Sequence, residues 1–247
     1  SICARTSGRT GPEALLMRFQ HSKAIWRDFP LLSAGAVVIQ GEIPDRDVTW
    51  QSRQFLNRAD TRLQGSSESE LPEIQAWRRA FAQMRLKPTQ YRCASEALLR
   101  RYRKDKALPH IHPLVDLCNA VSMAYAIPIA VFDLDRVDGN LKVRYADGAE
   151  VYLAFSGETE HPTPGEVVFA DAARQAHARR WTNRQSALSA VRSDTARALV
   201  VAEALHDDAV ADVAALLDEL QDALTVARAA PDMVAQLSSD QPSITTS

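Results

Sequence analysis

The chain has 247 residues, a formal net charge of −2 and a hydrophobic content of 46%, values typical of a water-soluble protein with one large domain or a domain with appended helices. No apolar run approaches the roughly 20 residues of a membrane-spanning helix, and the N-terminus lacks the apolar core of a secretory signal. Three cysteines without close spacing, Cys3, Cys93 and Cys118, are typical of reduced thiols in a cytoplasmic protein.

Charge is unevenly distributed along the chain. Residues 78–106 contain ten Lys and Arg against two acids, whereas residues 203–240 contain nine acids against one base. A basic segment of this kind can hold a phosphate backbone, although a solvated helix face has the same composition. The acidic segment favours a solvated helix or a protein partner.

The N-terminal half predicts an extension, a strand and two helices. Residues 1–16 are rich in Gly, Ser and Arg, and we expect a non-native or disordered extension before a natural start at Met17. Residues 34–40 read as a buried strand. Apolar residues every three or four positions predict an amphipathic helix over 71–84, and a second helix is expected over 95–103 with Ser95 as its cap.

The C-terminal half predicts a helix over 113–126 that leads into several strands. Asp147 and Gly148 indicate a hairpin between two of these strands, and another two are expected to pair with each other. The expected strands cover residues 127–132, 141–145, 149–155, 165–171, 176–181 and 199–202. Mostly hairpin-linked strands mixed with helices favour the α+β class, with largely antiparallel sheets flanked by helices.

A C-terminal helix is expected at about residues 207–229. Its apolar residues recur every three or four positions, so the helix either docks on the rest of the protein or associates with a second copy of the chain. Residues 231–247 are polar and are expected to form a flexible tail, which leaves 17–230 as the folded domain.

Three motifs carry the chemistry of the sequence, between about residues 91 and 203. The first is Arg-Cys-Ala-Ser-Glu-Ala-Leu-Leu-Arg-Arg, residues 92–101. The second contains Val115, Asp116 and Asn119, followed by Pro128 and the run Phe-Asp-Leu-Asp at 132–135. The third combines Gly-Glu-Val-Val-Phe-Ala-Asp, residues 165–171, with Arg-Trp-Thr-Asn-Arg-Gln-Ser, residues 180–186.

In order and spacing these motifs resemble the B3/B4 domain family, which includes the editing domain of the phenylalanyl-tRNA synthetase β subunit. The resemblance is closer to the freestanding members, some of which remove canavanine from tRNA(Arg). It implies a B3/B4-like fold and an enzyme that hydrolyses the ester of a mischarged tRNA in trans, with tRNA as partner and no cofactor. A guanidino-oxy side chain would need a carboxylate in its pocket, for which the sequence offers four candidates, Asp116, Glu166, Asp171 and Glu203.

Two positions depart from the synthetase pattern. Ala130 stands where the synthetase domain has a His, and Arg184 stands where it has the Glu that meets the tyrosine hydroxyl. Because a guanidinium cannot accept that hydroxyl proton, the removal of tyrosine from tRNA(Phe) is less favoured than the removal of canavanine.

Asn119 matches an Asn of the synthetase pocket, and we expect it to orient water or the terminal ribose, with Asp116 as a base or an acceptor for a cationic substrate. A core hydrogen bond for Asn119 and a helix cap for Asp116 are equally favoured. Further substrate or tRNA contacts are expected from Arg92, Ser95, Glu96, His110, His112, Glu166, Asp171, Arg180, Trp181, Asn183, Arg184 and Gln185, among which Trp181 offers a stacking surface for adenine.

Other functions remain open at this level. His110 and His112 have the spacing of two metal ligands, but no third ligand is evident, so we expect no metal. A thiol nucleophile at Cys93 or Cys118 lacks any local signature. A tRNA-binding or RNA-binding module without catalysis, or a binder of small molecules or proteins, would fit the same fold.

Overall fold

The structure is a computed structural model, and it describes residues 16–41, 43 and 46–246. The extension expected over 1–16 lies outside the described residues, apart from Leu16. Met17 is buried, and its backbone N–H donates to Oγ1 of Thr246 over 3.2 Å. The described ends of the chain are therefore joined to each other.

A four-stranded sheet forms the centre of the molecule. Its strands are all antiparallel and follow the order β11 (Met233–Leu237), β2 (Ser33–Gln40), β10 (Arg197–Ala204) and β3 (Ile129–Asp133). Alternate residues of β2 face two different cores: Val37 and Ile39 pack with the helices, whereas Ala36 and Val38 belong to a cluster with the second sheet. Both faces are therefore buried, which explains why β2 reads as a continuous apolar run.

The second sheet has six strands, of which β1 and β4 are parallel neighbours and the others are antiparallel. Its order is β12 (Ser243–Thr245), β1 (Arg18–His21), β4 (Leu141–Tyr145), β7 (Val167–Ala170), β8 (Ala176–Arg179) and β9 (Arg184–Gln185). Phe19, Phe132 and Phe169 pack against one another between the two sheets. Strands β5 (Tyr152–Leu153) and β6 (Thr159–Glu160) form a separate pair.

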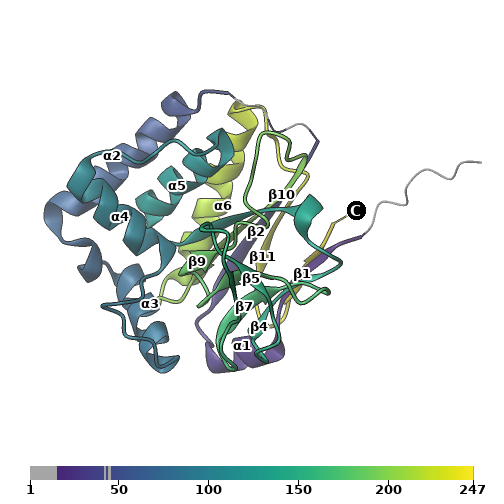
Figure 1. Cartoon of the computed structure of the whole chain (residues 1–247). Helices are drawn as coiled ribbons and strands as arrows, with labels where there is room; N and C mark the ends of the chain where they lie inside the picture. The colour runs from purple at the N-terminus through teal and green to yellow at the C-terminus, as the bar shows by residue number, and fades with distance from the viewer. Residues whose placement is uncertain (1–15, 42, 44–45, 247) are drawn as a thin grey trace, which may run out of the picture.

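Helices α2 (Thr49–Gly65), α5 (Pro113–Tyr125) and α6 (Ala209–Val226) share an apolar cluster with the outer face of the four-stranded sheet. The others are α1 (Lys23–Asp28), α3 (Pro72–Gln83), α4 (Ala94–Asp105) and two short 3-10 turns, Glu68–Glu70 and Leu134–Arg136. Helices α2 to α5 lie on one side of the molecule and most strands on the other, whereas α1 lies on the side of the strands next to β4 (Figure 1). The α+β class, with largely antiparallel sheets and a C-terminal helix, is confirmed.

Helix α6 docks within its own chain. Its apolar face is buried, and Leu217 meets the sheet at Gly35, where an added Cβ would lie 2.8 Å from Leu217 Cδ2. Apart from the exposed Val210, the stripe that suggested self-association is used for this internal contact. Among the described helices, none is long and apolar enough to cross a membrane.

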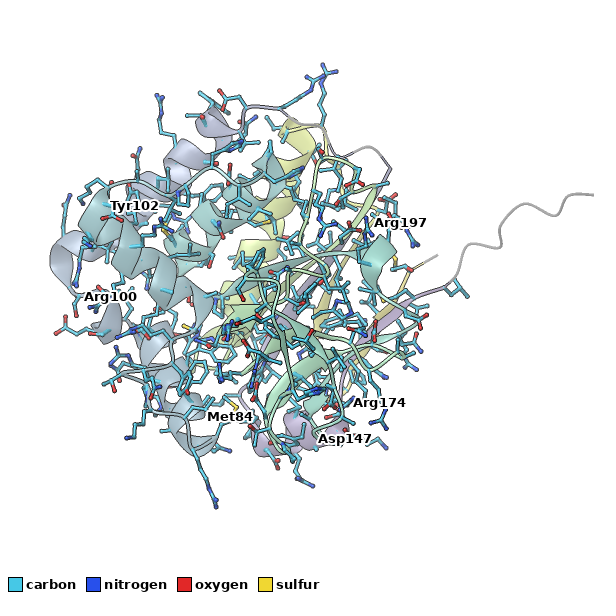
Figure 2. All side chains as sticks on the ribbon, in the orientation of Figure 1. Met84, Arg100, Tyr102, Asp147, Arg174 and Arg197 are labelled. Carbon is cyan, nitrogen blue, oxygen red and sulfur yellow. The ribbon has the colours of Figure 1, made fainter. Side chains whose placement is uncertain are left out.

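Two predictions about the strands are wrong. Strand β4 pairs with β1 and β7 rather than with β5, and the turn after β4 is instead closed by Glu150, which accepts from the N–H groups of Asp147 and Gly148. Asp147 also forms an ion pair with Arg174 on the surface (Figure 2).

The segment expected as a flexible tail instead adds a strand to each sheet. Strand β11 pairs with β2, and β12 pairs with β1, so the folded unit extends beyond residue 230. Both are edge strands, which pair with the sheet on one side only.

Candidate active site

A small cavity of about 60 Å³ lies between the two sheets, and we call it the intersheet cavity. Its walls come from the start of α4, the segment that enters β3, strands β7 to β10 and the turn after β8. The lining residues are Ala94, Pro128, Ile129, Ala130, Phe169, Ala178, Trp181, Thr182, Asn183, Arg184, Gln185, Val201 and Glu203. Apolar side chains therefore surround a small number of polar groups.

Glu203 is the buried carboxylate of this cavity, with 2% of its surface exposed. Its Oε1 accepts from Trp181 Nε1 over 2.9 Å and lies 2.6 Å from His21 Nε2. Among the described residues, no hydrogen bond reaches Oε2. A buried carboxylate is costly unless its oxygens are paired, so Oε2 retains the capacity to bind a donor from a ligand.

The turn that carries Trp181 is strained. Arg180 and Trp181 have φ angles of +46° and +55°, a left-handed conformation that costs a non-glycine residue roughly 1–2 kcal/mol. Glu166 holds the turn, because its Oε1 accepts from the N–H of Arg180 over 2.9 Å while both oxygens bind the buried guanidinium of Arg179. Although burial acts to raise the pKa of Glu166, the hydrogen bonds and charge of Arg179 lower it overall.

Trp181 does not offer the expected stacking surface. Its indole is completely buried and packs edge-on against Phe29 and Trp77, with ring centroids 4.7 and 4.9 Å away. Its contribution to the cavity is to hold Glu203 through the indole N–H.

The residues after Trp181 carry polar groups at the edge of the cavity. The side chain of Arg184 is 40% exposed, contacts Glu160 Oε1 over 3.2 Å and lies over the ring of Tyr152. Gln185 Nε2 donates to the carbonyl of Val131 over 2.6 Å. The hydroxyl of Thr182 is buried and has no hydrogen-bond partner among the described residues.

The first motif holds the walls of the cavity in place. Asn183 Nδ2 donates to the carbonyl of Arg92 over 2.8 Å, and the buried Glu96 pairs with Arg78 and Arg92. Ser95 is not the helix cap, because Cys93 occupies that position and the hydroxyl of Ser95 instead donates to the carbonyl of Ala126.

Asp171 is bound within its own turn and does not line the cavity. It accepts from His177 Nε2 and from the N–H groups of Asp138 and Gln175. Burial acts to raise its pKa, but these hydrogen bonds lower it overall. A structural role explains all of its contacts.

Asn119 and Asp116, the expected catalytic pair, line a different cavity. This second cavity, which we call the helical cavity, has a volume of about 690 Å³ and lies between α2, α5 and the segment after α4. It shares no lining residue with the intersheet cavity. Asp116 bonds to His110 Nδ1 and accepts from the N–H of Ile111 over 3.0 Å. The nearby His112 is the N-cap of α5 and accepts from the N–H of Leu114.

The remaining nucleophile candidates are inert in this fold. Burial raises the pKa of the Cys93 and Cys118 thiols to about 12, so neither supplies a thiolate near neutral pH. His110 and His112 do not form part of a three-residue ligand group among the described residues.

A family model described as the B3/4 domain matches residues 76–226, which is more than half of the chain and includes every residue of the intersheet cavity. The chain belongs to the B3/4 domain family. Two phenylalanine–tRNA ligase β subunits are similar to it, that of Bradyrhizobium diazoefficiens with 43% identity over 61 residues and that of Cereibacter sphaeroides with 34% over 64 residues. These matches cover 25% and 26% of the chain, and each spans 8% of the β subunit.

Among solved structures, an N-terminal fragment of the phenylalanyl-tRNA synthetase β subunit from Pyrococcus horikoshii aligns with 88% of the chain and 53% of the fragment, at 10% identity and a TM-score of 0.47. Ala130 and Arg184, the two positions that the resemblance leads us to expect as departures from the synthetase pattern, both line the intersheet cavity. Glu203 lines it as well, and the sequence had marked this residue only as one of four carboxylates. The signal for Glu203 that the sequence contained was an acidic residue within a mostly apolar strand, Arg197–Ala204.

Proposed function

We propose that this protein is an aminoacyl-tRNA deacylase that hydrolyses the ester of a mischarged tRNA in trans, with the intersheet cavity as the pocket for the amino-acid side chain. Membership of the B3/4 domain family supports the reaction class. The position of Ala130 and Arg184 in one cavity supports the assignment of the pocket.

The observation that carries the proposal furthest is the Glu203 carboxylate, with one oxygen held by Trp181 and His21 and the other free of protein hydrogen bonds among the described residues. Such a group favours a cationic side chain with N–H donors. Ala130 leaves space where the synthetase pattern places an imidazole. Canavanine esterified to tRNA(Arg) is therefore the first candidate substrate.

The chemistry required of the protein is modest, because an aminoacyl ester is already labile. The enzyme must hold the ester, place a water near its carbonyl carbon and stabilise the oxyanion that forms when the water attacks. Arg184, partly exposed at the edge of the cavity, is placed to supply positive charge to that oxyanion. The proton of the attacking water leaves to solvent, and the ribose oxygen takes up a proton as the ester bond breaks.

A second candidate is a tRNA-binding module without catalysis. The absence of the His and Glu of the synthetase pattern at Ala130 and Arg184 favours it. Hydrolysis of tyrosyl-tRNA(Phe) is less favoured for the same reason, since Arg184 stands at the position of the carboxylate that would meet the tyrosine hydroxyl.

The test is a deacylation assay on canavanyl-tRNA(Arg), arginyl-tRNA(Arg) and tyrosyl-tRNA(Phe). Selective hydrolysis of the canavanyl ester would support both the reaction and the substrate. Survival of all three esters with the protein in large excess would contradict the deacylase proposal, and binding without turnover would favour the second candidate.

A further inference from the structure

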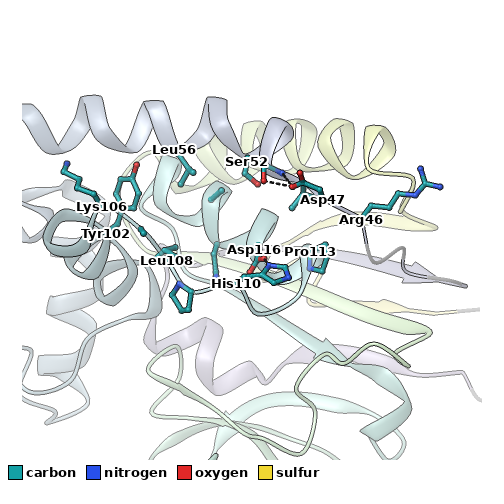
Figure 3. A pocket seen from close by; sticks show the side chains of 16 residues that line it. Arg46, Asp47, Ser52, Leu56, Tyr102, Lys106, Leu108, His110, Pro113 and Asp116 are labelled. Carbon is teal, nitrogen blue, oxygen red and sulfur yellow. Dashed lines mark hydrogen bonds and ion pairs between the residues drawn. The ribbon is translucent and has the colours of Figure 1, made fainter.

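The helical cavity has the size and the mixed lining of a ligand site. Its volume of about 690 Å³ lies within the roughly 300–1,000 Å³ of typical ligand pockets. Figure 3 shows Ser52 and Leu56 of α2 on one side, and His110 and Asp116 on the other. Tyr102 and Lys106 close one end, and Arg46 lies at the opposite end.

The carboxylates of this cavity make hydrogen bonds within the protein. Asp116 is bound to His110 and to the N–H of Ile111. Asp47 accepts from both the hydroxyl and the N–H of Thr49, and these hydrogen bonds lower its pKa. Both oxygens of Asp116 are therefore used, whereas the exposed Asp47 keeps Oδ2 without a hydrogen bond among the described residues.

Two neutral polar groups remain open. The hydroxyl of Ser52 is buried without a hydrogen-bond partner, in a side chain with 7% exposure. The amide of Asn119 has no hydrogen bond among the described residues, although Asn119 lines the cavity. A buried hydroxyl without a partner, such as that of Ser52, is unusual in a folded protein and indicates a ligand or water that completes it, whereas Asn119 is partly exposed.

A nucleobase fits this combination. An Asn amide presents one donor and one acceptor side by side, which matches the amino group and ring nitrogen on the edge of cytosine or adenine. Leu56, Pro109, Pro113 and Ala120 supply apolar contacts for the faces of a flat ring. Arg46 at one end supplies positive charge for a flanking phosphate, whereas Lys106 at the other end pairs with Asp60 over 3.2 Å.

The distance to the intersheet cavity identifies which nucleotide the helical cavity would take. Helix α4 connects the two cavities, with Ala94 in the first and Tyr102 and Lys106 at the second. The eight positions from Ala94 to Tyr102 and the twelve to Lys106 correspond to about 12–18 Å along a helix, a separation that fits neighbouring nucleotides of one strand. A nucleotide further along a single strand reaches this distance.

We infer that the helical cavity binds an unpaired nucleotide that precedes the aminoacylated adenosine at the 3′ end of tRNA. Because tRNA ends in the sequence cytidine-cytidine-adenosine, this nucleotide is a cytidine. The tRNA source rests on the proposed function, whereas the nucleotide site rests on the cavity alone. A free cytidine nucleotide would present the same chemistry.

The test uses cytidine 5′-monophosphate as the probe, with binding followed by calorimetry or ligand-observed NMR on the full chain. Asn119→Ala should weaken binding about tenfold, since a base-edge contact to a side-chain amide is worth roughly 1–3 kcal/mol. Ser52→Ala, which removes a hydroxyl without a protein partner, should weaken it less and should leave the fold intact. Asn57→Ala is the matched control, on the exposed part of the same helix and outside the cavity.

Competition then separates the two sources. Displacement of the probe by uncharged tRNA, but not by tRNA from which the last three nucleotides have been removed, supports the tRNA end. Displacement by neither tRNA overturns that source and assigns the site to a free nucleotide.

Absence of cytidine monophosphate binding to folded wild-type protein, or equal losses in Asn119→Ala and Asn57→Ala, overturns the site. Cytidine binding that depends on Asn119, in a protein that hydrolyses no ester, would remove the proposed function while the site stands. Normal ester hydrolysis by Asn119→Ala, together with no binding of nucleotide by the wild-type protein, would remove the nucleotide site while the proposed function stands.

Discussion

The substitution Glu203→Gln removes the charge of the intersheet cavity while it keeps the size of the side chain. The oxygen that accepts from Trp181 Nε1 is retained, and His21 Nε2 can still donate to it. What is lost is the charge that a cationic side chain would meet at Oε2. A hydrogen bond to a charged group is worth about 1.5–3 kcal/mol, so we expect kcat/KM for canavanyl-tRNA(Arg) to fall roughly 10- to 150-fold.

The assay is single-turnover deacylation, with Glu158→Gln in an exposed loop as the matched control. Thermal unfolding of Glu203→Gln should remain close to that of the wild type, because its internal hydrogen bonds persist. An unchanged rate would show that Glu203 does not meet the substrate. An equal loss on a neutral aminoacyl ester would show that the residue acts through the structure of the cavity and not through charge.

Three further predictions follow from particular contacts. The double substitution Ala130→His and Arg184→Glu restores both groups of the synthetase pattern, so hydrolysis of tyrosyl-tRNA(Phe) should appear or increase; an unaltered substrate preference would contradict the assigned pocket. Gly35→Ala places a Cβ 2.8 Å from Leu217 Cδ2, so urea denaturation should show a loss of about 1–3 kcal/mol, whereas Gly65→Ala, with nothing within 4 Å, should be neutral or slightly stabilising. The pKa values of Glu166 and Asp171 are lowered by folding, so their contribution is complete above the ordinary carboxyl range and is lost as pH falls below about 4; a melting temperature that stays constant from about pH 5 to pH 3 would contradict this.

Local patterns in the sequence predicted much of the fold. The strand at Ser33–Gln40 and the helices at Pro72–Gln83, Ala94–Asp105 and Pro113–Tyr125 agree with expectation to within a few residues. Each has a strong apolar pattern or a proline at its first turn, which are signals carried within the element itself.

The errors concern pairing between distant segments. Asp147 and Gly148 do form a turn. The partners of β4, however, lie 22 to 28 positions away in β7 and 122 positions away in β1, and a turn signal carries no information about them. Strands β11 and β12 were missed because they are short, lie in a mostly polar segment and are stabilised by the sheets to which they add. Helix α2 was missed because its mean composition is polar, with Phe55 and Ala59 among its few buried residues.

The candidate site was predicted in part. The motif at residues 180–186 does reach the intersheet cavity, and the two departures from the synthetase pattern fall in that cavity as well. Asn119 and Asp116 lie in another cavity, because α5 directs them toward α2 and away from the sheets. The role of Glu203 depends on Trp181 and His21, which are 22 and 182 positions away, and such a contact is not visible in a single sequence.

The most direct test of the account is the hydrolysis of canavanyl-tRNA(Arg) by the wild-type protein, with arginyl-tRNA(Arg) as the comparison. The account predicts rapid loss of the canavanyl ester and survival of the arginyl ester, with the canavanyl rate reduced in Glu203→Gln. Persistence of both esters in the presence of excess folded protein would contradict the central claim.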